Sequence, residues 1–166
     1  MTTNRKGGIS IIRIGLIAGA LGLLIVAVAA ITYFTDQASK RTPLDVAPFP
    51  GAVEWGTSDV RPTSRNLFFR VPDSPENVAA YYQQKMLDHY GNNEQGCVRL
   101  PATGNAPGSE TDPNIPPYLF RCMFDNSGFN SSQYTQVEIY PGQANPDPFF
   151  DAAGMTVVQY KQQWQR

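Results

Sequence analysis

Histidine and cysteine are scarce in this chain of 166 residues, which contains one histidine, His89, and two cysteines, Cys97 and Cys122. One histidine cannot form a multi-histidine metal site, and any histidine-dependent catalytic triad would have to use His89. The sequence also lacks a Cys-x-x-Cys pair, a Gly-x-Ser-x-Gly motif and a glycine-rich phosphate-binding loop. We therefore expect a non-catalytic protein without a cofactor or metal of its own, and we infer no small-molecule substrate.

Acidic residues are absent from the first 35 positions, where three of the 13 basic residues lie (Arg5, Lys6 and Arg13). The rest of the chain therefore has 10 basic and all 14 acidic residues, a formal charge of 10 minus 14, or −4. A basic surface for nucleic acid is not expected from this balance.

Charged residues are also missing from positions 14–35, a run of 22 residues rich in Leu, Ile, Val and Ala. At about 1.5 Å per residue, a helix of this length reaches roughly 33 Å, enough to cross the hydrocarbon core of a bilayer. The basic residues before the run outnumber Lys40 and Arg41 after it, which favours a cytoplasmic tail (1–13) and an extracytoplasmic C-terminal part in a bacterial membrane. A cleavable secretory signal is the alternative, because Ala27-Val28-Ala29 before Ala30 suits a signal peptidase.

Small residues recur within this apolar run. Gly15 and Gly19 form a small-xxx-small pair, and Ala18 and Gly22 repeat the spacing on a neighbouring face. Such faces allow close helix packing in lipid, although Gly and Ala are common in membrane helices in any case. We predict that these four residues pack against other integral membrane subunits.

All 14 prolines lie after residue 42, and Pro43, Pro48 and Pro50 fall in a segment, 36–50, that we expect to be a stiff linker. From residue 51 onward, short alternating runs predict strands at 53–60, 66–71, 95–100, 118–125, 133–140 and 155–164. Asp73-Ser74-Pro75-Glu76 has the features of a helix start, which predicts a helix over 75–90 that ends at Gly91. The fold class is therefore α+β: one transmembrane helix, then an antiparallel sheet with one packed helix, in the order β-β-α-β-β-β-β.

Cys97 and Cys122 lie on neighbouring predicted strands in a compartment that we expect to be oxidising, which predicts a disulfide. The alternation raises a difficulty, because Cys97 shares a strand face with Arg99, whereas Cys122 shares one with Phe120 and Phe124. Either a bulge lies between them or the register differs by one residue.

Two long loops, 101–117 and 141–153, are expected to bind a partner or to be irregular. In the second, Pro148, Phe149 and Phe150 form a candidate partner-contact segment, unless the two rings are tucked under the domain. Paired carboxylates in these loops (Asp147 and Asp151, Glu110 and Asp112) could chelate calcium or act as acid and base, but neither loop matches a calcium-binding pattern. Trp55 and Trp164 are candidates for carbohydrate stacking.

The segment Pro48-Phe49-Pro50-Gly51-Ala52, followed by a strand and then by Ser74-Pro75-Glu76 and an aromatic-rich helix, resembles small anchored α+β modules of bacterial envelope proteins whose function is largely unassigned. The resemblance covers about 40 residues of capping and packing signals. It implies the fold and the compartment and transfers no catalytic residue.

These observations lead to two functional hypotheses. The first is an accessory or structural subunit of a bacterial membrane protein complex, such as one of respiratory or photosynthetic electron transfer, that stabilises its partners through its helix and outer loops. The alternative is an independent membrane-anchored sensor or ligand-binding module of the envelope. A hydrolase would gain support only if two loop carboxylates met in a cleft.

Overall fold

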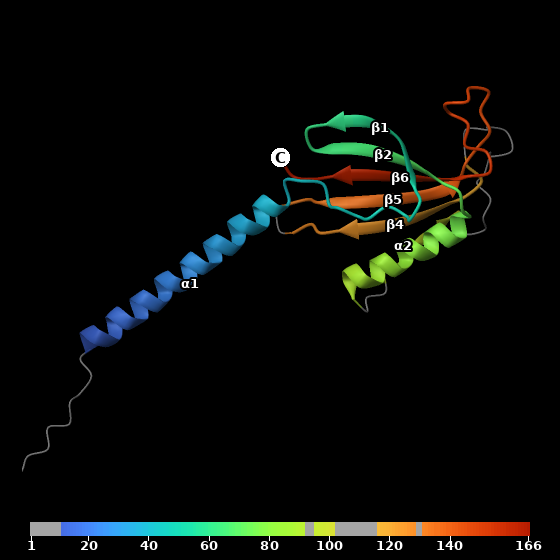
Figure 1. Cartoon of the computed structure of the whole chain (residues 1–166). Helices are drawn as coiled ribbons and strands as arrows, with labels where there is room; N and C mark the ends of the chain where they lie inside the picture. The colour runs from blue at the N-terminus through green and yellow to red at the C-terminus, as the bar shows by residue number, and fades with distance from the viewer. Residues whose placement is uncertain (1–10, 92–94, 102–115, 129–130) are drawn as a thin grey trace, which may run out of the picture. The chain divides into compact units, whose positions relative to one another are not determined.

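A computed structural model describes residues 11–91, 95–101, 116–128 and 131–166 of the chain (Figure 1). The chain divides into two compact units, Met1–Ser39 and Lys40–Arg166. Among the described residues, the first unit contains one helix, and the second is a sheet with one packed helix. The predicted α+β fold class is therefore confirmed.

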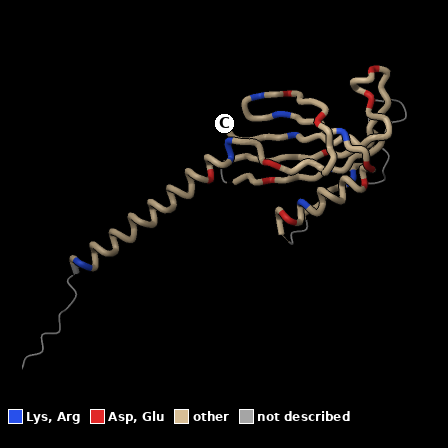
Figure 2. Tube along the Cα trace, viewed as in Figure 1, with Lys and Arg blue, Asp and Glu red and all other residues tan. Residues whose placement is uncertain are grey.

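The first unit contains helix α1 (Ile11–Ser39), which is long and apolar enough to be a candidate membrane span. No charged residue lies between Arg13 and Asp36, as the colouring of Figure 2 makes visible. The helix is longer than the predicted 14–35, because residues 36–39 continue the helical turn and the Ser39 hydroxyl donates to the carbonyl of Asp36 at 2.7 Å. By length and composition, the same helix could be an anchor or a signal sequence.

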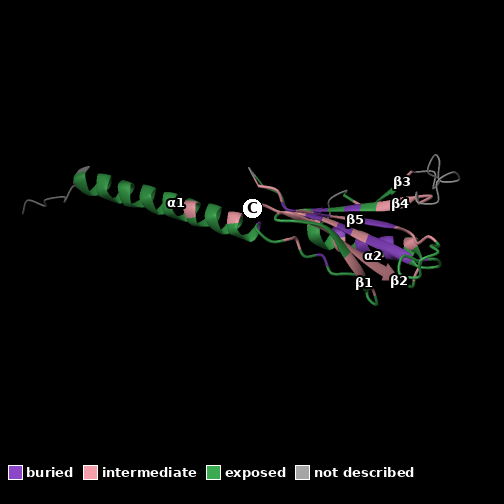
Figure 3. Cartoon of the chain, turned by 90° about the horizontal axis from the view of Figure 1, so that it is seen from above, coloured by how far each residue is buried: buried purple, intermediate pink, exposed green. Residues whose placement is uncertain are grey.

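The second unit is built on a six-stranded antiparallel sheet with the strand order β1-β2-β6-β5-β4-β3. Its strands are β1 (Val53–Arg61), β2 (Ser64–Val71), β3 (Val98–Leu100), β4 (Leu119–Asp125), β5 (Tyr134–Pro141) and β6 (Thr156–Gln163). The buried residues concentrate in the central strands (Figure 3). Strand β3 is shorter than predicted, because the Cys97 backbone N–H donates to the Gln83 side chain at 2.7 Å rather than to a neighbouring strand.

Helix α2 (Pro75–Tyr90) has the predicted bounds. The Ser74 hydroxyl accepts a hydrogen bond from the Asn77 N–H at 3.2 Å, and Gly91 ends the helix at φ +70°, a conformation that glycine adopts without strain. Val78, Tyr82 and Met86 are buried against one face of the sheet, as their spacing predicts. We call this side the helix face and the other side the open face.

The prediction that residues 36–50 form a stiff, extended linker is wrong. Residues 36–39 belong to α1, and residues 40–50, here called the strap, pack on the second unit. Val46 is buried in the core, and the side chains of Thr135 and Gln162 donate to the carbonyl of Leu44 at 2.8 and 3.1 Å. The strap lies along the helix face beside α2, where proline lets an extended segment pack without needing a backbone donor at every residue. The packed domain therefore begins at residue 40 instead of 51.

The strap is also fixed by buried tyrosines. The Phe49 N–H donates to the hydroxyl of Tyr82 at 3.0 Å, and the hydroxyls of Tyr82 and Tyr160 lie 2.7 Å apart. Burial is the main cause that raises the pKa of Tyr82 to about 12, and burial together with the neighbouring Tyr82 raises the pKa of Tyr160 well above its ordinary value. Both phenols therefore remain protonated at neutral pH, and they can form hydrogen bonds with each other and with the strap backbone.

The open face contains one buried carboxylate, Glu138, at the centre of the sheet. It lies 2.6 Å from the Lys161 ammonium and 3.0 Å from the Arg121 guanidinium, and Gln136 donates to it at 2.7 Å. The sequence alternation predicted a polar residue here but not its burial, which comes from the long side chains of the neighbouring strands. Those side chains neutralise the charge that they cover.

Candidate functional site

The loop between β5 and β6, residues 142–155, is an ordered structure that we call the aromatic loop. Its two ends are joined by a hydrogen bond from the Gly142 N–H to the Met155 carbonyl at 2.7 Å, and the Ala152 N–H donates to the Gln143 carbonyl at 3.0 Å. Residue 142 must be glycine, because a Cβ at this position would overlap the carbonyl of Ala152. Ala152 itself is buried, so the base of the loop is part of the packed domain.

The carboxylates of the aromatic loop stabilise its turns. Asp147 accepts a hydrogen bond from the Phe149 N–H at 2.9 Å, and Asp151 accepts one from the Ala153 N–H at 3.1 Å. Such side-chain contacts to the backbone two residues ahead are typical of aspartate in turns. Among the residues that the structure describes, no group of three or more His, Cys, Asp or Glu side chains could hold a metal ion. Glu110 and Asp112 lie outside the described residues.

Two side chains of the sheet fasten the aromatic loop to the open face. The Trp55 indole N–H donates to the carbonyl of Phe149 at 2.8 Å, and the Arg70 guanidinium donates to the carbonyl of Asp151 at 3.1 Å. The Arg70 guanidinium also lies over the Trp55 ring, 4.8 Å from its centroid. These contacts connect positions more than 80 residues apart, so spacing in the sequence could not have revealed them.

Phe149 and Phe150 project from this fastened loop. Their side chains are 60% and 54% exposed, and the two rings meet edge to face at 5.0 Å. The interpretation that these rings are tucked under the domain is therefore wrong. Pro148 is the second residue of the turn that presents them, which begins at Asp147. The segment Pro148, Phe149 and Phe150 remains a prediction for partner contact.

The rings border a hollow on the open face, which we call the aromatic pocket, with a volume of about 420 Å³. Five aromatic side chains line it, together with three residues of β1: Trp55, Phe68, Tyr140, Phe149 and Phe150, and Gly56, Thr57 and Ser58. A second hollow of about 380 Å³ shares Trp55, Tyr140 and Phe150 with it. Phe68 and Tyr140 were not among the residues predicted from the sequence, although each occupies an open-face position of its strand.

The Tyr140 hydroxyl makes no hydrogen bond to any part of the chain that the structure describes. Burial is the main cause that raises the pKa of Tyr140 to about 12, and the nearby Glu138 carboxylate contributes. The hydroxyl therefore stays protonated at neutral pH, and it can both donate and accept a hydrogen bond. It is a polar group available at the wall of a largely aromatic pocket.

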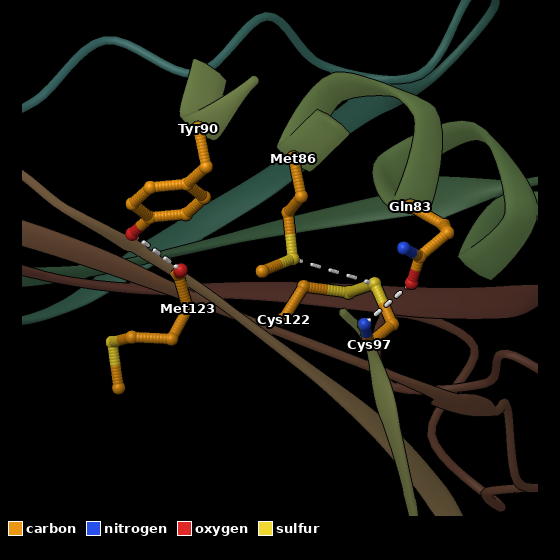
Figure 4. The surroundings of a disulfide bond; sticks show 6 residues. All are labelled: Gln83, Met86, Tyr90, Cys97, Cys122 and Met123. Carbon is orange, nitrogen blue, oxygen red and sulfur yellow. Dashed lines mark hydrogen bonds between the residues drawn. A yellow bond between two sulfur atoms is a disulfide. The ribbon is translucent and has the colours of Figure 1, made fainter. Parts of the chain in front are cut away.

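The predicted disulfide is present between Cys97 and Cys122, on the helix face (Figure 4). The Cys97 sulfur lies 3.9 Å from the Met86 sulfur, and Gln83 accepts the Cys97 N–H. Neither a bulge nor a register shift is needed, because Arg99 pairs with Phe120 and shares this face. Its guanidinium lies 4.3 Å from the Tyr118 ring centroid and 5.8 Å from that of Phe120, so a charged residue fits beside the cysteines.

The remaining predicted residues do not join the pocket. Gly15, Ala18, Gly19 and Gly22 lie on α1, and a Cβ added at any of the three glycines would meet no atom within 4 Å, which leaves this face open for the predicted packing. The Trp164 backbone N–H donates to Thr63, at the end of the sheet opposite the aromatic loop, so the two tryptophans do not form one platform. The loop predicted at 101–117 lies largely outside the described residues.

The fold and the site together define an α+β domain with an aromatic pocket, preceded by a candidate membrane span. No family model, curated protein or solved structure matches the chain.

Proposed function

We propose that the protein is a non-catalytic, single-pass accessory subunit of a bacterial membrane protein complex. In this proposal α1 anchors the chain with its N-terminus in the cytoplasm, and the domain 40–166 lies outside. The basic residues before α1, the uncharged length of α1 and the disulfide of the domain support this arrangement.

The observation that carries the proposal is the exposure of Phe149 and Phe150 on an ordered loop. A flexible loop could fold such rings away from water, whereas this loop is fixed at Gly142 and through Trp55 and Arg70. Exposed apolar groups that are held rigidly in place are typical of binding surfaces, because little conformational entropy is lost when a partner covers them.

The small-residue surface of α1 supports the same conclusion. Three glycines and Ala18 leave room for a neighbouring helix to approach closely, and the aromatic loop supplies a second contact outside the lipid. Two separate contacts with one complex would each be weak and together strong, since the second forms within an assembly that the first has already made.

The experiment is purification of the full chain from its native membranes in a mild detergent, with identification of every co-migrating protein. We expect integral membrane proteins to co-purify with the wild type, and to be lost or strongly reduced in the variant Phe149→Ser/Phe150→Ser. The matched control is Val98→Ser, because Val98 is an exposed apolar residue, at 57%, on the distant strand β3. The co-migrating proteins would also test the hypothesis of an electron-transfer complex.

Two results would contradict the proposal. One is a wild-type protein that migrates alone, and the other is a complex that survives unchanged when both phenylalanines are replaced. A domain recovered without α1 from native membranes would instead support the secretory-signal interpretation.

The aromatic pocket favours a second candidate function, an independent envelope module that binds a ligand without other subunits. This alternative predicts that the purified chain alone binds its ligand and that replacing Gly15 and Gly19 by Leu has no effect. The accessory-subunit proposal predicts that the same replacements weaken the complex.

A further inference from the structure

The surroundings of the aromatic pocket are negatively charged. On the open-face side, strand β1 and the aromatic loop together contain three carboxylates, on Asp59, Asp147 and Asp151, against one basic residue, Arg61. Glu54 is not counted, because it pairs with Phe69, which packs against the core, and lies on the helix face. All three carboxylates are exposed, and among the described residues none of them forms an ion pair. Counting Arg70 at the edge of the site as well, the local formal charge is 2 minus 3, or −1.

A carboxylate lies on each side of the pocket. On the strand side, Asp59 accepts a hydrogen bond at 3.0 Å from Asn66, which precedes the pocket residue Phe68 by two positions on the same strand face. On the loop side, Asp147 accepts the N–H of the pocket residue Phe149. A ligand in the pocket would therefore contact aromatic rings and experience a negative potential.

Aromatic walls combined with nearby carboxylates are the surroundings that favour an organic cation. Arg70 already makes a cation–π interaction of this kind, since its guanidinium lies over the Trp55 ring. The Tyr140 hydroxyl, which has no hydrogen-bond partner among the described residues, could accept a hydrogen bond from a bound ammonium or guanidinium group. A neutral apolar group would gain nothing from the carboxylates, and an anion would be repelled by them.

The position of the pocket beside β1 indicates that the cation is part of a protein chain. Strand β1 is the outermost strand of the sheet and has no described strand on its other side. Its pairing with β2 is irregular between Glu54 and Gly56 and between Ser58 and Arg61, and the regular residues between are Gly56, Thr57 and Ser58. These three residues line the pocket, so an extended segment beside them would direct every second side chain toward it.

We propose that an extended segment of a partner subunit pairs with β1 at Gly56–Ser58 and inserts a lysine or arginine side chain into the aromatic pocket. This inference rests on the proposed accessory function and names the chemistry of its contact. The partner's backbone contributes ladder hydrogen bonds, and the cation in the pocket fixes the register of the added strand.

The test uses the full chain in detergent with Trp164→Phe, so that Trp55 is the only fluorescent indole. The probes are three pentapeptides, acetyl-Thr-Thr-X-Thr-Thr-amide, in which X is arginine, citrulline or norleucine. Citrulline keeps the shape of arginine without its charge, and norleucine tests an apolar side chain. We expect the arginine peptide to change Trp55 emission with an affinity about fivefold or more above that of the other two.

The carboxylates provide matched variants. Asp147→Asn keeps an oxygen that can accept the Phe149 N–H, so it removes charge while preserving the turn, and we expect it to weaken arginine-peptide binding about threefold. Adding Asp59→Asn should weaken it further, and Asp88→Asn, on α2 at the opposite face, should leave it unchanged. Binding should also weaken as the salt concentration rises.

Several outcomes would overturn the inference. Equal affinity for the norleucine and arginine peptides would make the pocket an apolar site, and equal affinity for free argininamide would make the ligand a small cation. Absence of peptide binding, in a protein whose complex still depends on Phe149 and Phe150, would reject the inference and leave the accessory function in place. Peptide binding by a chain that has no partners in native membranes would retain the cation specificity and reject the accessory function.

Discussion

The disulfide between Cys97 and Cys122 should be the largest single contribution to the stability of the domain that one substitution pair can remove. The two cysteines are 25 positions apart, so the bond closes a loop of 26 residues. In the chain-entropy model, closing a loop of this size in the unfolded state corresponds to about 3.5 kcal/mol at 25 °C. We expect Cys97→Ala/Cys122→Ala to lower the free energy of unfolding by roughly this amount, with a small further loss of packing beside Met86.

The assay is urea unfolding of the full chain in detergent, followed by tryptophan fluorescence. Both tryptophans, Trp55 and Trp164, lie in the domain and none lies in α1, so the signal reports on the domain alone. Reducing the wild type with a phosphine should lower its stability to nearly that of the double variant, and the double variant itself should not respond to the reductant.

A loss below about 1 kcal/mol would refute the reasoning. It would mean that the contacts of the short strand β3 with β4, and of Gln83 with the Cys97 backbone, already hold the loop ends together in the unfolded ensemble or that the bond is strained when folded. Urea unfolding of Cys97→Ala/Cys122→Ala with and without Gln83→Leu would separate these causes.

Three further predictions concern the rest of the domain. Val46→Ala should lower the free energy of unfolding by about 1 to 3 kcal/mol because Val46 is 7% exposed, whereas Val60→Ala, at 71% exposed, should change it by less than about 0.5 kcal/mol; equal effects would show that the strap is not packed. Glu138→Gln should cost about 1 kcal/mol in urea unfolding, because Arg121 and Lys161 remain about 40% exposed and regain water, and a stabilised variant would contradict the arrangement. The raised pKa of Tyr82, about 12 against 10 when unfolded, keeps the folded phenol protonated where the unfolded one ionises. Stability should therefore be complete below pH 10 and fall between about pH 10 and 12, more steeply in the wild type than in Tyr82→Phe, and equal slopes would count against the buried pair.

Local signals in the sequence were enough to predict α2 and the succession of strands along the chain, although not their order in the sheet. The helix start at Ser74 and Pro75 and the stop at Gly91 depend on short-range capping, which a sequence displays directly. The disulfide could be predicted because only two cysteines exist, although the face that they share with Arg99 could not. The stacking of that arginine on Tyr118 and Phe120 depends on strand pairing between segments some 20 residues apart.

The strap and the aromatic pocket could not be predicted, because both depend on long-range contacts. Prolines at 43, 48 and 50 are compatible with a free linker and with an extended segment packed on a core. The packed arrangement is distinguished only by hydrogen bonds between the strap backbone and the distant side chains of Tyr82, Thr135 and Gln162. The pocket joins β1, β2, β5 and the loop after β5. Phe149 and Phe150 could be found from the sequence, whereas Trp55 gave no sign that it would hold their loop in place.

The boundary between the two units, at Ser39 and Lys40, sets a limit on where the chain can be cut without damaging the domain. A protease or a truncation that cuts after residue 50 would leave Leu44, Val46 and Phe49 with α1 and release a domain whose hydrophobic core lacks these three side chains. A cut that keeps the whole second unit intact must therefore lie before residue 40, and the signal-peptidase position before Ala30 meets this condition.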